Sequence, residues 1–253
     1  HALCPDMEQL VFELAYVLNH TGAEPNATAE KIGSMVPSLV TVRDDIAIEW
    51  ATAYNRAHRY DEAIRILEGH DFVPCEGGET ALAKAYIAAW YGKGMDLRAA
   101  GKDAEALDAF RRAEVLPESL GAGLWHMATI VPAQYEEALL LEKAGDRDAA
   151  FKIYDYFNTL YVDFFSNMNL PLLPVYQALG DIRMGKADAA KALLEKAIAG
   201  WKFERERHDS GYFGTTPFFI SYMDDPHTAR VKNYDALIAT AEAVLDGTSE
   251  LLK

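Results

Sequence analysis

Apolar residues recur along most of the chain at the three- and four-residue spacing of amphipathic helices, and residue-by-residue alternation is nearly absent. Thr216 and Asp225 are each followed by a proline, a pattern typical of a helix start. The last helix is expected to end near Asp246 and to cap the series of helices. The sequence therefore predicts an all-α protein. The expected helices come in pairs at 6–20 and 27–36, 45–57 and 61–69, 79–100 and 103–115, 130–144 and 146–160, and 172–184 and 187–206.

One short motif occurs four times, in which a turn residue is followed five positions later by an alanine. A glycine at the turn adopts the left-handed geometry that ends a helix, and the alanine lets the second helix approach the first closely. Each copy therefore predicts a helical hairpin. The turn residues are His58, Gly101, Gly145 and Gly185, and the alanines are Ala63, Ala106, Ala150 and Ala190.

This motif resembles the tetratricopeptide repeat over most of the chain. The last hairpin departs from the repeat at Pro174 and Asp181, where the family usually has Trp and Tyr. The resemblance implies one domain over residues 1–253, a right-handed superhelical solenoid of hairpins with long irregular connectors. The closest match, in the second hairpin, consists of Trp90, Gly94, Leu97, Gly101, Ala106, Phe110 and Ala113. The expected units are residues 6–36, 44–69, 79–115, 130–160 and 172–206, followed by capping helices within 217–246.

The charge narrows the range of partners. Asp and Glu number 39 against 24 Lys and Arg, a formal net charge of −15, which argues against binding nucleic acid or an anionic membrane surface. No apolar run approaches the roughly 20 residues of a membrane span. The two cysteines, Cys4 and Cys75, show no metal-ligand spacing. A cytoplasmic protein with reduced thiols is the expectation.

The stretch "VPCEGGET", residues 73–80, could carry chemistry. A phosphate loop would need a lysine, a hydroxyl residue and a preceding strand, and two carboxylates would repel a phosphate. No GxGxxG dinucleotide fingerprint occurs, and Cys75 lacks ligand partners. The stretch is therefore interpreted as a connector between helices, and no cofactor or metal is expected.

Three connectors carry a narrower resemblance. "VPCEGGE", "PESLGAGLW" and "YFGTTPFF" resemble landmarks of a family of large bacterial proteins, with departures at Ser119 and Thr215. In that family a domain of unknown function, with carbohydrate-enzyme-like character, precedes a tetratricopeptide-repeat region. The resemblance covers roughly residues 25–235. It implies that the chain is the carboxy-terminal part of a longer protein.

The expected interaction surface lies at one end of the hairpin 79–115. Because the two helices of a hairpin run antiparallel, the connectors before and after it emerge at the same end. An apolar patch rimmed by carboxylates is predicted there, suited to docking the upstream domain or another protein. Its residues are Glu76, Glu79, Glu118, Leu120, Leu124, Trp125 and His126.

No residue is predicted to be catalytic, because GxSxG, HExxH and SxxK motifs are all missing. His126 near Glu136, and His208 beside Asp209, offer acid–base pairs, but structural and loop roles explain them better. The predicted function is non-catalytic docking.

Two alternatives remain open. Glu76, Glu79 or His126 could contribute to a sugar site in a carbohydrate-active enzyme assembly. The aromatic run at 154–168 could offer a surface that stacks on a carbohydrate, and an aromatic-lined groove could make the chain a small-ligand sensor.

Overall fold

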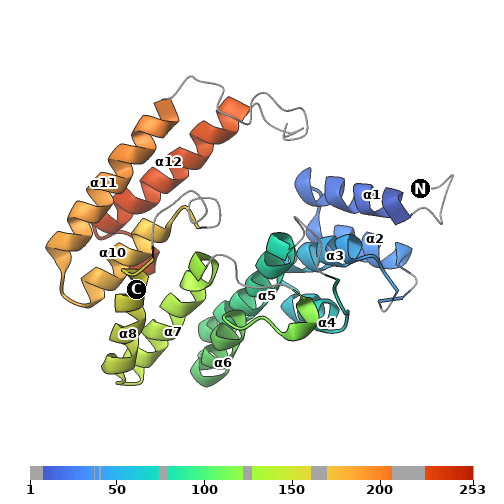
Figure 1. Cartoon of the computed structure of the whole chain (residues 1–253), viewed down its shortest axis with the longest axis horizontal. Helices are drawn as coiled ribbons and strands as arrows, with labels where there is room; N and C mark the ends of the chain where they lie inside the picture. The colour runs from blue at the N-terminus through green and yellow to red at the C-terminus, as the bar shows by residue number, and fades with distance from the viewer. Residues whose placement is uncertain are drawn as a thin grey trace. The chain divides into compact units, whose positions relative to one another are not determined.

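The computed structural model describes residues 8–36, 38–39, 41–73, 79–121, 127–160, 170–206 and 226–252 (Figure 1). Its regular elements are all helical, and no strand occurs among these residues, so the predicted all-α class is confirmed for them. The α-helices are α1 (Glu8–His20), α2 (Pro25–Met35), α3 (Asp44–Arg56), α4 (Tyr60–Glu68), α5 (Glu79–Ala99), α6 (Asp103–Ala113), α7 (Val131–Lys143), α8 (Arg147–Phe157), α10 (Leu173–Arg183), α11 (Ala187–Glu206) and α12 (Pro226–Leu245). Three short 3-10 helices are η1 (Glu118–Leu120), η2 (Met127–Ile130) and η5 (Glu250–Leu252).

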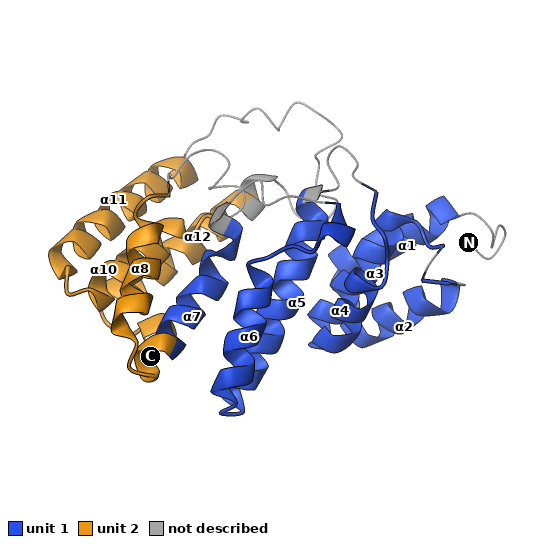
Figure 2. Ribbon diagram, turned by 60° about the horizontal axis from the view of Figure 1, so that its bottom comes forward, with its two compact units in different colours: residues 1–140 blue, residues 141–253 orange. Residues whose placement is uncertain are grey.

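The predicted helix pairs are present, with ends that differ by at most a few residues. The expected start at Thr216 lies outside the described residues. The chain divides into two compact units, residues 1–140 and 141–253 (Figure 2). The single domain expected over residues 1–253 stays a prediction.

The four predicted turn residues all adopt left-handed backbone geometry. Their φ angles are 55° at His58, 73° at Gly101, 90° at Gly145 and 79° at Gly185, and His58 is the only non-glycine with positive φ among the described residues. Each turn is closed by a hydrogen bond from the next amide back to the preceding helix, as in a Schellman motif. These bonds are Arg59 N to Tyr54 O, Lys102 N to Leu97 O, Asp146 N to Leu141 O and Lys186 N to Asp181 O.

The four motif alanines are all buried. Ala63, Ala106, Ala150 and Ala190 have exposed fractions of 1% or less. A close approach occurs in the α5–α6 hairpin, where a Cβ added to Gly94 would lie 2.4 Å from the Phe110 ring. Small residues thus set the spacing between the paired helices.

Unit 1 is built from hairpins whose apolar faces form one core. Helix α3 packs against α1, α2, α4 and α5, while α5 packs against both α4 and α6. At the α4–α5 contact the Tyr60 ring lies against Gly92, where an added Cβ would come within 2.3 Å of the ring. The core extends to Ala133 and Leu140 of α7.

Unit 2 contains α8, α10, α11 and α12. Helix α10 packs against α8, α11 and α12, and α11 and α12 form the last pair. Gly180 of α10 lies against Tyr154 of α8, where an added Cβ would be 3.1 Å from the tyrosine Cβ. Arg183 Nη2 donates a hydrogen bond of 2.8 Å to the carbonyl of Leu252, which ties η5 to α10.

No helix in the described part of the chain is long and apolar enough to cross a membrane.

Candidate functional site

The two connectors that flank the α5–α6 hairpin lie side by side, as the antiparallel arrangement predicts. The amide of Phe72 donates a 3.1 Å hydrogen bond to the carbonyl of Ser119. Glu118 is exposed on η1. Leu120, in contrast, is only 1% exposed and belongs to the core of unit 1, so its side chain is not open to a partner.

Most of the predicted docking patch falls where the structure is not described. Glu76, Leu124, Trp125 and His126 lie outside the described residues, and Glu79 is placed only as the first residue of α5. The patch therefore stays a prediction. His208 and Asp209 also lie outside the described residues, as do residues 161–168 of the aromatic run at 154–168.

Glu136, considered above as half of an acid–base pair, is engaged elsewhere. It is buried on α7 and forms an ion pair with Arg98 of α5. A carboxylate held by a guanidinium inside the protein is stabilised in its charged form, which does not suit a general acid. The structure thus gives Glu136 a role in attaching α7 to the hairpin.

A histidine–aspartate pair that the sequence reasoning missed lies at the base of the first connector. His70 Nε2 is 2.7 Å from Asp44 Oδ1, and His70 Nδ1 is 2.9 Å from the carbonyl of Leu39. The other oxygen of Asp44 accepts a 2.8 Å hydrogen bond from the Val73 amide. Because both ring nitrogens are occupied and the ring is buried, this pair fastens the connector and does not form a catalytic dyad.

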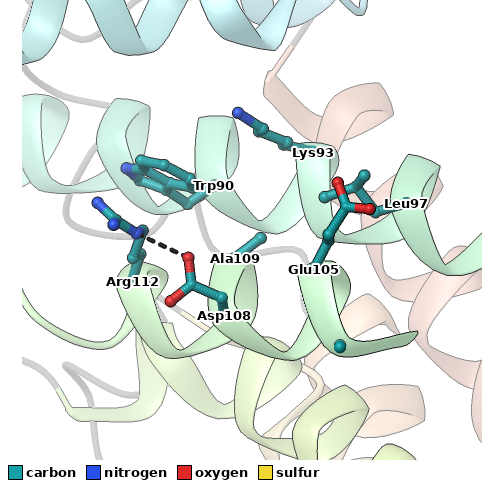
Figure 3. Close-up of a pocket in the computed structure, with 8 residues that line it drawn as sticks. Trp90, Lys93, Leu97, Glu105, Asp108, Ala109 and Arg112 are labelled. Carbon is teal, nitrogen blue, oxygen red and sulfur yellow. Dashed lines mark hydrogen bonds and ion pairs between the residues drawn. The ribbon is translucent and has the colours of Figure 1, made fainter. Parts of the chain in front are cut away.

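An open groove lies between α5 and α6 (Figure 3). Its volume is about 510 Å³. Residues three, four or seven positions apart on one helix share a face, so Trp90, Lys93 and Leu97 of α5 all reach the groove. The residues that line it are Trp90, Lys93, Leu97, Ala104, Glu105, Asp108, Ala109 and Arg112.

Two cations lie against the single indole of this groove. The Arg112 guanidinium carbon is 4.9 Å from the Trp90 ring centroid, and the Lys93 Nζ is 5.1 Å from it. Trp90 is only 7% exposed, so its ring serves mainly as a fixed support. A cation over an indole gains roughly 0.5–1 kcal/mol at an exposed site, enough to favour one side-chain position. The two cations are therefore held in place before any ligand arrives.

The acidic partners of these cations are weakly held. Lys93 pairs with Asp61 at 2.7 Å and Arg112 pairs with Asp108 at 3.0 Å, but the two aspartate side chains are 79% and 68% exposed. Ion pairs of this kind contribute little to stability because water screens them. An incoming carboxylate could replace either aspartate at small cost.

Two titratable groups in and beside the groove have raised pKa values. The hydrogen bond and the negative charge of Asp108 raise the pKa of Arg112, so the guanidinium remains charged. Burial, followed by the charge of Glu68, raises the pKa of Tyr86 to about 12, so this neighbouring phenol remains neutral. Its hydroxyl donates a 3.3 Å hydrogen bond to Glu68. Neither group can exchange a proton near neutral pH.

The described residues contain no group of three or more His, Cys, Asp or Glu side chains that could hold a metal ion.

Comparison of the chain with models of protein families, with curated proteins and with solved structures finds no match.

Proposed function

We propose that the chain is a non-catalytic docking module that binds a segment of the upstream domain of its own polypeptide or of another protein. We further infer that its hairpins are of the tetratricopeptide type and continue through both units as one right-handed solenoid. The repeated left-handed turns and buried alanines, present in both units, support this reading. Such arrays commonly offer extended surfaces to protein partners.

The observation that carries the docking function is the pair of cations on Trp90. Lys93 and Arg112 lie against the indole, and the aspartates with which they form ion pairs are exposed. An acidic segment of a partner would gain charge-assisted hydrogen bonds and would displace weakly held groups. Leu97 and Ala109 add apolar surface next to the cations. The groove thus favours a segment in which a carboxylate lies next to an apolar side chain.

The binding test uses the region that precedes this chain in its gene. That region is titrated into the purified chain by calorimetry at two salt concentrations. Wild-type chain is expected to bind, and the double variant Lys93→Glu and Arg112→Glu should weaken the affinity at least about tenfold. Because electrostatic attraction is screened, the wild-type affinity should fall as salt rises, and that of the double variant should change less.

Lys191→Glu is the matched control, since Lys191 is exposed on α11 and forms only a long ion pair, of 3.9 Å, with the exposed Glu195. This variant should bind like the wild type, and circular dichroism should show that all three proteins fold. Binding that the double variant leaves unchanged would place the docking face elsewhere. Failure of the wild type to bind would refute docking of the upstream region.

The solenoid has its own test in small-angle X-ray scattering of the purified chain. An elongated particle is expected, since hairpins in a solenoid contact only their neighbours. A radius of gyration near the value of roughly 18 Å for a compact globule of this length would contradict the solenoid.

A further inference from the structure

The end of α6 meets α7 through a cluster of polar groups within unit 1, of which Glu137 is buried and Glu114 and Gln134 are half-buried. Gln134 Nε2 of α7 donates a 3.1 Å hydrogen bond to Glu114 Oε2, at the residue that follows the last turn of α6. Arg111 Nε of α6 donates a 2.8 Å hydrogen bond to Glu137 Oε1 of α7. Glu137 is only 8% exposed and Glu114 is half-buried, so the two carboxyl groups lie largely out of water, while the Arg111 side chain is exposed.

Two oxygens in this cluster have no hydrogen-bond partner. Glu114 Oε1 and Gln134 Oε1 are both buried from water, and neither is matched by a donor. With Glu114 ionised, both atoms are acceptors, and burying an unmatched acceptor is unfavourable. One proton on Glu114 changes this arrangement, because its hydroxyl can donate to the Gln134 amide oxygen or to the neighbouring Glu137 carboxylate.

The surrounding charges favour that proton. Burial raises the pKa of the Glu114 carboxyl to about 8, and the neighbouring Glu137 adds to the rise, while Gln134 and Arg111 oppose it. The other charges at this contact are Glu136 of α7 and Arg98 of α5, which neutralise each other in an ion pair. Arg111, which already binds Glu137, is therefore the one cation among these groups that faces the two carboxyls.

We propose that Glu114 and Glu137 form a proton-dependent clasp that fastens α7 to the end of α6. With the proton in place, the two carboxyls share a hydrogen bond and Gln134 completes the contact. Without it, two adjacent carboxylates repel each other and the buried oxygens remain unmatched. The clasp is a conformational device of the fold, and it does not depend on the docking function.

The sign of the pH effect follows from linkage. Glu114 has a higher pKa in the folded protein than in the unfolded chain, so the folded state binds the extra proton between the two values. Its contribution to stability is complete below the unfolded pKa of about 4.5, falls as the pH rises, and is lost above about 8. Carboxylates elsewhere add their own pH dependence, so the clasp must be measured as a difference between proteins.

Glu114→Gln is the decisive variant, because its amide has the shape of the protonated carboxyl and can both donate and accept. Urea unfolding of the wild type and of this variant is compared at pH 5.5, 6.5 and 7.5. The wild-type folding equilibrium constant, relative to that of the variant, should fall by about tenfold across this interval. One full proton would give about a hundredfold change, which solvent screening of a partly exposed carboxyl reduces.

Glu118→Gln removes an exposed carboxylate a few residues further on and serves as the matched control. Its stability should run parallel to that of the wild type over the same pH range. A constant ratio between the wild type and Glu114→Gln would overturn the proposal.

A second measurement covers the case in which Glu114→Gln fails to fold. Carbon-13 NMR of the wild-type carboxyls, assigned with Glu114→Asp, follows the ionisation of Glu114 directly. A midpoint between about pH 7 and 9 is expected, and a midpoint below about pH 5.5 would refute the clasp.

Discussion

The α5–α6 hairpin of unit 1 and the α10–α11 hairpin of unit 2 contain the same turn motif, but the same face of their first helix has a different role in each. Aligning Ala106 with Ala190 places Lys93 of α5 opposite Gln177 of α10, and Leu97 opposite Asp181. In unit 1 this face of the first helix lines an open groove. In unit 2 the corresponding face is buried.

Helix α10 uses its buried face to hold the end of α8. Gln177 Nε2 donates hydrogen bonds of 2.9 Å to the carbonyl of Phe157 and 3.0 Å to that of Leu160. Asn158 Nδ2 donates a 2.9 Å hydrogen bond to Asp181 Oδ1. These bonds satisfy carbonyl groups that a helix end leaves without partners. The turn residue and the alanine thus form the hairpin. The residues on this face of its first helix decide whether the face packs against the same chain or remains open.

The largest effect is expected from Gln177→Leu. The substitution keeps the volume but leaves the carbonyls of Phe157 and Leu160 without a donor, which should lower the free energy of unfolding by roughly 2–4 kcal/mol. Lys93→Leu changes the corresponding residue of the open face and should lower it by at most about 1 kcal/mol. Urea denaturation of both variants tests the comparison. Equal losses would show that the two faces do not differ in this way.

Leucine at the motif alanines should have intermediate effects that are similar in the two hairpins. Ala106→Leu and Ala190→Leu each place a larger side chain at a helix crossing with no room for it, at a cost of roughly 1–3 kcal/mol. Thermal unfolding followed by circular dichroism measures the loss. An unchanged melting temperature in either variant would mean that its alanine is not at a close crossing.

The smallest effects are expected at the turns. Gly185→Ala puts a side chain at a φ of 79° and should destabilise the protein by about 1 kcal/mol. His58→Gly relieves a left-handed non-glycine residue, but it loses the 2.9 Å contact between Tyr60 Oη and His58 Nδ1. Because the unfolded chain also gains freedom, the net change should stay within about 0.5 kcal/mol in either direction. A large loss on His58→Gly would indicate that the His58–Tyr60 contact has a structural role.

Local signals were enough to place the helices and their turns. The apolar spacing placed every described helix pair to within a few residues, and each of the four turn residues in the motif is left-handed, including the non-glycine His58. These features depend on residues a few positions apart, whose preferences act within one hairpin.

The sites were harder to predict because their residues come from separate elements. Trp90 was identified as a position of the repeat, and its pairing with Lys93 on α5 and Arg112 on α6 depends on how the two helices pack. Leu120 was expected in an apolar docking patch, and it is buried in unit 1 because η1 packs against α4. Hydrophobicity alone does not tell an anchor for a partner from a core residue.

The sequence by itself determined the helical class, the hairpin turns and the small residues at the crossings, because each is encoded within a few neighbouring positions. Only the tertiary structure decided which helix faces are open and which carboxyls lie close together. Glu114 and Glu137 acquire their shared environment when α7 packs against α6 and removes water from both. The charge of a side chain, and whether it is open to a partner, depend on its burial and on residues distant in the sequence. The spacing of neighbouring residues gives no information on either.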